Sequence, residues 1–301
     1  MRTAYFKYIF ALLLFGSNGV VASHIQLNSY EIVLLRSVLG GAVLAAIYFL
    51  TGRKWTVLQH RKDGMYIALS GIAMTLDWLL LFEAYQQIGV SLGMLINYCG
   101  PVIVVALSVV LFKERMTRFK AAALMMALLG IFLISGQAAA KGVNGWGLLC
   151  AGLSALAYSA MVIFNKLSQE ITGMENAVLQ LSFAAVTVVV FVGCKQGFTM
   201  EIAPGDWLPV LWISLLNTGA GCYYYFSSIG RLPVQTVAIC GYIEPLSAVL
   251  FSVVFLREML FPLQAVGALL IVGGAFMVEG VFQKNSCNSL HIHKVFKYKG
   301  R

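Results

Sequence analysis

The sequence predicts an all-α integral membrane protein whose ten transmembrane helices form two inverted repeats of five helices. The composition, the recurrence of long apolar runs and an internal duplication lead to this prediction. Of the 301 residues, 60% are hydrophobic and 11% are charged, whereas a soluble domain carries roughly 25% charged residues. The chain is therefore expected to fold in a lipid bilayer.

Apolar runs of about 20 residues, the length that crosses a hydrocarbon core of ~30 Å, recur along the sequence with short polar breaks between them. No break is long enough to hold a soluble domain, so any chemistry must lie inside the helix bundle. The predicted spans cover residues 7–27, 30–51, 65–85, 90–112, 119–138, 145–166, 174–194, 207–228, 233–256 and 261–282.

Residues 88–136 align without a gap on residues 232–280, at an offset of 144. Both copies carry a tyrosine, a proline three residues later, a Ser-Val-Val run and a glutamate after a basic residue. The matched positions are Tyr98 and Tyr242, Pro101 and Pro245, Ser108 and Ser252, and Glu114 and Glu258. A duplication of this length indicates two halves built on one plan.

Because five is an odd number, the second repeat must enter the membrane the opposite way up from the first. Inverted repeats underlie many transporters, since exchanging the conformations of the two halves converts an inward-open cavity into an outward-open one. We therefore predict a first repeat over residues 1–140, a second, inverted repeat over 141–282, and a basic cytoplasmic tail over 283–301.

The formal charge of +9 could suggest a nucleic-acid partner, but the positions of the basic residues argue against one. With the N-terminus in the cytoplasm, most basic residues fall inside, which is the positive-inside pattern. Lys141, Lys195 and Arg257 fall outside. We expect both termini in the cytoplasm, contact with membrane lipid, and no nucleic acid. The sequence has no N-x-[ST] sequon, which is consistent with a bacterial cytoplasmic (inner) membrane.

The sequence disfavours enzymes, metal centres and ATP-driven pumps. The six cysteines form no CxxC pair or Cys/His cluster, and none of the four histidines lies in the middle of a span, so neither a metal site nor a disulfide framework is expected. No nucleophile and base stand together, and no GxxxxGK[ST] loop is present. We expect no cofactor, and channel behaviour stays open.

Several features of the sequence, taken together, are typical of one protein family. They are the two five-helix repeats, the Tyr242-Ile243-Glu244-Pro245 run, the Arg257-Glu258 ending, and the Gly-rich spans that follow. The sequence resembles the drug/metabolite transporter superfamily, and is similar over about residues 5–282 to its ten-helix branch, often called EamA-like. The resemblance implies a central cavity between the first four helices of each repeat. It also implies export of amino acids or other small metabolites.

Two charged residues lie deep in predicted spans. Arg36 is about two turns inside the second span, where a charge costs ~3 kcal/mol or more. Its planar guanidinium could clamp a carboxylate or phosphate, or it could pair structurally with Glu31 or Asp77. Asp77, in the middle of the third span, could carry a coupling proton or neutralise Arg36. Both alternatives stay open.

Matched prolines break the fourth and ninth spans. Proline removes the hydrogen bond to the carbonyl four residues earlier. Pro101 therefore leaves the Asn97 carbonyl without its helical donor, and Pro245 does the same to the Gly241 carbonyl. Broken helices at matched depths indicate a transporter's central site and hinge, with a plain packing kink as the alternative. Glu244 is interpreted first as a gate residue and second as a proton carrier.

Aromatic and amide side chains complete the candidate set, and such a lining suits an amphipathic solute. Ordinary packing is the alternative for any single ring. The predicted substrate-binding residues are Arg36, Asp77, Trp78, Asn97, Tyr98, Asn217, Tyr224 and Tyr242. The predicted hinge or gate residues are Pro101, Glu244 and Pro245.

These observations favour a secondary transporter or facilitator that exports a small amphipathic metabolite, with amino acids preferred, by alternating access. The alternative is proton-coupled efflux of lipophilic cations or drugs. The first span has no acidic residue and Arg36 is positive, and both facts disfavour a cationic guest. A structural scaffold would not need broken helices at matched depths. The protein is expected to act as a monomer or weak dimer.

Overall fold

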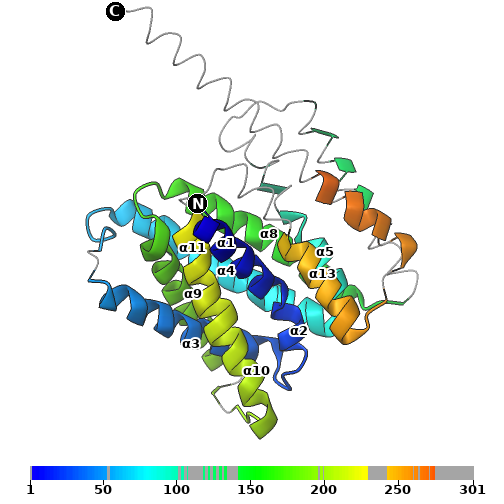
Figure 1. Cartoon of the computed structure of the whole chain (residues 1–301), viewed down its shortest axis with the longest axis horizontal. Coiled ribbons are helices and arrows are strands. Elements are labelled where there is room, and N and C mark those ends of the chain that lie inside the picture. The colour runs from blue at the N-terminus through cyan, green and yellow to red at the C-terminus, as the bar shows by residue number, and fades with distance from the viewer. Residues whose placement is uncertain are drawn as a thin grey trace, which may run out of the picture.

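The computed structural model describes residues 2–52, 55–100, 142–195, 197–198, 200–229, 243–259, 261–263, 265–270 and 272–274, with scattered positions between 103 and 133. The regular structure in these residues is helical (Figure 1). Its named elements are α1 (Arg2–Gly16), α2 (Asn18–Ala22), α3 (Ser29–Leu50), α4 (Arg61–Ile88), α5 (Val90–Asn97), α8 (Gly145–Leu167), α9 (Gly173–Lys195), η1 (Pro204–Asp206), α10 (Trp207–Leu211), η2 (Trp212–Ala220), α11 (Gly221–Ile229) and α13 (Ile243–Leu256).

Five helices among the described residues are long and apolar enough to cross a membrane, and they match five predicted spans. They are Thr3–Ala22, in which α1 and α2 together make one span, and Ser29–Leu50, Arg61–Ile88, Gly145–Leu167 and Gly173–Lys195. Large apolar side chains face outward, with exposed fractions of 88% for Leu50 and 74% for Leu208, as a lipid-facing surface requires. The other predicted spans are described in part or as shorter helices. Most of the predicted fifth span and all of the tail lie outside the described residues.

Two spans that the sequence predicts as continuous are interrupted. The first breaks between α1 and α2, where the Ser17 hydroxyl donates to Leu14 O (2.7 Å). The eighth contains the π-helix η2, in which the Thr218 hydroxyl donates to Ile213 O, five residues earlier (2.9 Å). Side-chain hydroxyls that bond to helix carbonyls are a known cause of such departures from regular α-helix.

The start of α3 is fixed by a capping box. The backbone N–H of Glu31 donates to Asn28 Oδ1, and that of Asn28 donates to Glu31 Oε2, both at 3.0 Å. This reciprocal arrangement satisfies two backbone donors that the first turn of a helix leaves unpaired. The Glu31 carboxylate therefore has a structural role at the helix end.

The packing of the helices repeats at the 144-residue offset. That offset places α1 and α2 on α8, α3 on α9, and α4 on the run from α10 to α11. The contact of α3 with η2 has its counterpart in the contact of α9 with α4, and α4 against α8 corresponds to α1 against α11. The helices α5 and α13 lie side by side (Figure 1). Helices from the two halves of the sequence are thus packed against each other.

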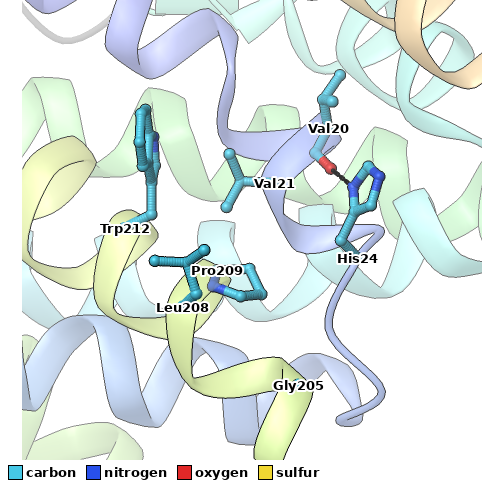
Figure 2. A pocket seen from close by; sticks show the side chains of 7 residues that line it. All are labelled: Val20, Val21, His24, Gly205, Leu208, Pro209 and Trp212. Atoms are coloured by element: carbon cyan, nitrogen blue, oxygen red, sulfur yellow. Dashed lines mark hydrogen bonds between the residues drawn. The ribbon is translucent and has the colours of Figure 1, made fainter.

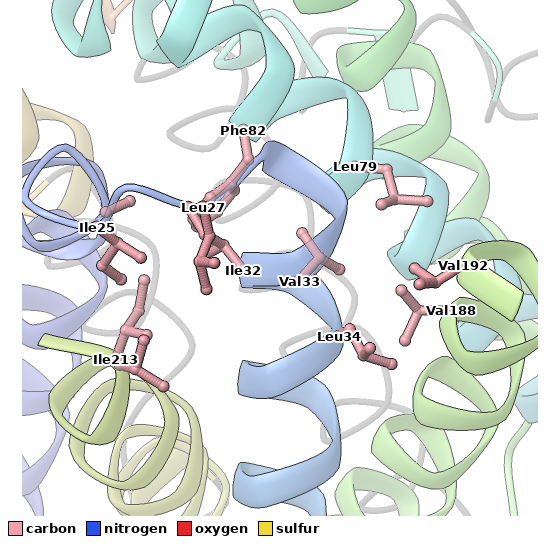
Figure 3. Packing of buried hydrophobic residues seen from close by; sticks show 12 residues of the cluster. Ile25, Leu27, Ile32, Val33, Leu34, Leu79, Phe82, Val188, Val192 and Ile213 are labelled. Atoms are coloured by element: carbon pink, nitrogen blue, oxygen red, sulfur yellow. The ribbon is translucent and has the colours of Figure 1, made fainter. Parts of the chain in front are cut away.

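Among the described residues, the largest buried apolar cluster lies where α2, α3, α4, α9 and η2 meet (Figure 3). Val33, Val188 and Val192 are fully buried within it, and Phe82 is 2% exposed. Phe82 belongs to the same cluster as Leu27 and Ile32 (Figure 3) and also lies close to the Arg36 guanidinium, so this cluster supports one side of the polar site described below.

Candidate functional site

Charged and polar side chains from α3, α4, α5, α8, η2 and α13 gather inside the bundle. We call them the central polar cluster: Arg36, Asp77, Trp78, Asn97, Ser154, Thr218 and Glu244. Arg36 and Asp77 are 3% and 4% exposed. Charged groups buried to this degree inside a membrane bundle are costly and are usually functional.

The Arg36 guanidinium is held by neutral groups. Its Nε donates to Thr218 Oγ1 (3.1 Å), and its Cζ lies 4.2 Å from the ring centroid of Trp78 and 5.0 Å from that of Phe82. Contact with aromatic faces stabilises a cation through the ring quadrupole. Within the described residues no group accepts a hydrogen bond from its Nη atoms, so the guanidinium keeps donors for another partner.

A glycine on α3 makes the Arg36–Thr218 contact achievable. Gly40 lies one helical turn after Arg36 and therefore on the same face. A Cβ at Gly40 would stand 2.7 Å from both Ser214 O and Thr218 Cγ2, closer than real contacts allow. The missing side chain lets α3 approach η2 closely enough for Arg36 to reach the threonine.

Asp77 is bound by two neutral side chains from other helices. Its Oδ1 accepts from Asn97 Nδ2 (2.9 Å) and from Ser154 Oγ (2.8 Å). The Asn97 amide also donates to Ser154 Oγ. Arg36 and Asp77 are within electrostatic range of each other, but these two described side chains do not form an ion pair. The proposed Arg36–Asp77 pair is therefore not formed in this structure.

Small residues on α8 bring Ser154 into contact with Asp77 and Asn97. Gly147, Ala151, Ser154 and Ala155 are buried, and their spacing of three or four residues places them on one face of α8. A face of small side chains lets helices approach closely in a membrane. The Ser154 hydroxyl can consequently reach both α4 and α5.

Glu244 completes the cluster from the first turn of α13. The residue is half-buried, its carboxylate is within electrostatic range of Arg36 and Asp77, and Pro245 beside it is buried. The Tyr85 hydroxyl contacts Met94 Sδ (3.4 Å) and lies in the range of the same charges. The structure thus brings together Arg36, Asp77, Trp78, Asn97 and Glu244.

Other predicted site residues lie elsewhere. The Asn217 amide donates to Ser17 Oγ and Asn18 Oδ1 at the break between α1 and α2, both at 3.0 Å. Tyr224 meets the ring of Phe10 edge-on with centroids 5.7 Å apart, and Tyr98 packs against the apolar cluster between α5 and α8. Pro101 and Tyr242 lie outside the described residues.

Sequence reasoning missed Ser154, Thr218 and Phe82. Asn217 is the residue predicted from the eighth span, but η2 is a π-helix, which changes the helical register, and its neighbour Thr218 contacts Arg36 instead. Phe82 could have been found from its spacing, because it follows Trp78 by four residues and shares its face. Nothing in the sequence distinguishes Ser154 from the other serines in apolar spans.

A separate groove of about 460 Å³ lies between α2 and the run of α10 and η2 (Figure 2). It is lined by Val20, Val21, His24, Gly205, Leu208, Pro209 and Trp212. The lining is mainly apolar, and His24 Nδ1 donates to Val20 O (2.7 Å). No residue of the central polar cluster lines this groove, so it is not the candidate site.

Long apolar helices around a buried, incompletely paired set of charges define a membrane protein of the transporter class. The chain belongs to the EamA-like transporter family, whose model matches residues 2–136 and again residues 145–280. This confirms the family resemblance seen in the sequence. It also confirms that the protein is a membrane transporter and not an enzyme.

Two relatives from Bacillus subtilis (strain 168) match nearly the whole chain. The uncharacterized transporter YxxF is 23% identical over 277 residues, which cover 90% of this chain and 88% of the relative. The uncharacterized transporter YwfM is 20% identical over 284 residues, which cover 92% and 93%. A protein of known crystal structure shares the fold, with a TM-score of 0.63 at 20% identity over 94% of this chain and 99% of that chain.

Proposed function

We propose that the protein is a secondary transporter or facilitator that exports a small amphipathic metabolite, with amino acids the favoured substrates, by alternating access. The observation that carries this proposal is Arg36. A guanidinium stays charged under all physiological conditions, yet this one is 3% exposed and bonded to a neutral hydroxyl. The described side chains of Asp77 and Glu244 lie within electrostatic range but form no ion pair with it. A buried cation that is not paired directly is unfavourable, and a substrate carboxylate would supply the pair.

The rest of the central polar cluster suits a zwitterion. Trp78 and Phe82 offer apolar ring surface beside the guanidinium. Asp77 and Glu244 supply negative charge nearby, which an ammonium group would complement. Two acids and aromatic rings also suit the alternative cargo, a lipophilic cation exchanged for protons, but Arg36 in the same cluster would repel it.

We further propose that ten spans form two inverted repeats, over residues 1–140 and 141–282, around a central cavity, with both termini and the tail 283–301 in the cytoplasm of a bacterial cell. A pair of contacts supports the inversion. The backbone of Glu170 donates to Asp63 Oδ2 (2.8 Å), and that of Gln26 donates to Asp206 Oδ2 (2.9 Å). At the offset of 144, Gln26 falls on Glu170 and Asp63 falls within one residue of Asp206.

The two contacts lie at opposite ends of α3. Gln26 precedes the start of α3 at Ser29, whereas Asp63 is in the first turn of α4, after the end of α3 at Leu50. A helix of 22 residues is about 33 Å long. Equivalent contacts separated by roughly the thickness of a bilayer are expected when one repeat is inverted relative to the other.

Counterflow into proteoliposomes tests the proposed function. Vesicles are preloaded with one unlabelled L-amino acid and diluted into a trace of the same labelled compound, for each of the protein L-amino acids in turn. Accumulation of at least one of them is expected, with loss of uptake in Arg36→Gln. The matched control is Arg61→Gln, which changes an exposed arginine at the start of α4. Uptake of tetraphenylphosphonium and of no amino acid would replace this proposal with the cation alternative.

A further inference from the structure

Two opposite charges share the central polar cluster without pairing. Arg36 and Asp77 are both more than nine-tenths buried and within electrostatic range of each other, and charges attract strongly in a medium of low dielectric. Nevertheless, the guanidinium is directed at Thr218 and the carboxylate at Asn97 and Ser154. The contacts of each side chain must therefore outweigh their mutual attraction.

On the carboxylate side the contacts form a closed triangle. The Ser154 hydroxyl accepts from Asn97 Nδ2 and donates to Asp77 Oδ1, while the same amide also donates to Asp77 Oδ1. The three groups belong to α8, α5 and α4 and are all at most 7% exposed. Water has little access to replace a lost partner here, so removing one hydroxyl leaves the carboxylate poorly satisfied.

We propose that Ser154, together with Asn97, is a positioning residue that holds the Asp77 carboxylate toward α5 and α8 and so prevents it from neutralising Arg36. The guanidinium then remains available to the anionic group of the substrate. The consequence for the substrate rests on the proposed function, whereas the restraint on Asp77 does not. If the Arg36–Asp77 pair were formed about 90% of the time, the binding-competent fraction would fall to about one tenth, and the apparent affinity would fall about tenfold.

The first test needs no substrate. Apparent melting temperatures in detergent are measured for Arg36→Gln, Asp77→Asn and the double variant, once in the wild-type background and once with Ser154→Ala. The effects are expected to add in the wild-type background, and a coupling of about 2–4 °C or more is expected with Ser154→Ala, because the freed carboxylate then pairs with Arg36. Equal coupling in both backgrounds would overturn the proposal.

Two further variants serve as a control and as a substitute for Ser154→Ala. Ser159→Ala is the matched control, because the Ser159 hydroxyl is also fully buried on α8 but donates to the carbonyls of Gly100 and Ala155. It should leave the Arg36–Asp77 coupling at its wild-type value. If Ser154→Ala does not yield folded protein, Asn97→Ala removes the other donor to Asp77. The same set of melting temperatures is then measured in the Asn97→Ala background, where the same coupling between Arg36 and Asp77 is expected.

The second test uses three related probes: L-leucine, its deaminated acid 4-methylpentanoate, and its decarboxylated amine 3-methylbutylamine. The two carboxylates should raise the melting temperature of the wild-type protein, and the amine should not. Ser154→Ala should increase the half-maximal carboxylate concentration about tenfold, and adding Asp77→Asn should restore it. An unchanged concentration in Ser154→Ala would refute the positioning role. If no probe stabilises the wild-type protein, the amino-acid proposal loses support while the melting-temperature cycle still decides the role of Ser154.

Discussion

Glu258 connects the two repeats at one end of the bundle, and replacing it with glutamine should measure that connection. Its carboxylate accepts hydrogen bonds from the backbone of Val90 (2.7 Å) and Ser91 (2.8 Å), the first two residues of α5. Val90 belongs to the first half of the sequence and Glu258 to the second. A carboxylate at a helix N-terminus satisfies unpaired N–H groups and interacts favourably with the helix dipole.

The expected loss of unfolding free energy follows from the interactions that Glu258→Gln keeps and those that it removes. The amide retains one acceptor oxygen, so one hydrogen bond to a charged group, worth about 1.5–3 kcal/mol, is lost or weakened together with ~0.3–1 kcal/mol of dipole interaction. Because Glu258 is half-buried, we expect a net loss near the lower end, about 2 kcal/mol. At ~2.1 cal/mol/K of unfolding entropy per residue, such a loss lowers the melting temperature of a 301-residue chain by about 3 °C.

Thermal unfolding in detergent, followed by tryptophan fluorescence, provides the assay. Glu201→Gln is the matched control, because Glu201 is exposed in the segment before η1. Gly89→Ala should show the same defect by another route. Gly89 has φ of +83°, which disfavours a side chain, and a Cβ there would lie 2.8 Å from Glu258 Oε1. A melting temperature for Glu258→Gln within 1 °C of the Glu201→Gln control would refute this reasoning.

Three further predictions concern the site and its support. Arg36→Lys should lose most counterflow activity while the protein stays folded, because an ammonium cannot bind a carboxylate in two-point fashion or stack as guanidinium does; wild-type kinetics in this variant would exclude the clamp. Gly40→Val should separate α3 from η2 and lower both stability and substrate affinity, since its side chain would collide with Ser214 O and Thr218; a normal melting temperature would show that the close approach is not needed. Asn28→Ala should cost about 1 kcal/mol of stability by removing a helix cap, with the half-saturation concentration for substrate unchanged, and a changed half-saturation concentration would show that the capping box also shapes the site.

The charged members of the site could be predicted because buried charge in an apolar span is conspicuous. Arg36, Asp77 and Glu244 each interrupt a long hydrophobic run, and the structure places all three in the central polar cluster. The matched prolines predict Asn97, because Pro101 removes the hydrogen bond to its carbonyl. Its observed contacts with Asp77 and Ser154 depend on how three helices pack, and the sequence does not specify that register.

Local hydrogen bonding explains two other differences from prediction. The sequence allows Glu31 as a partner for Arg36, but the run Asn28-Ser29-Tyr30-Glu31 has the spacing of a capping box, and the structure uses the carboxylate there. That signal was readable in the sequence. The π-helix was not, because the Thr218 hydroxyl that bonds to Ile213 O gives no pattern distinct from that of an ordinary helical threonine.

Competition in counterflow tests most directly whether Arg36 binds the anionic group of the substrate. For the labelled L-amino acid that gives the highest counterflow, uptake is measured against an excess of its deaminated acid and, separately, of its decarboxylated amine. Inhibition by the acid, little inhibition by the amine, and loss of uptake in Arg36→Gln are the expected results. Inhibition by the amine alone, with uptake undiminished in Arg36→Gln, would contradict the assignment of Arg36 as the carboxylate site.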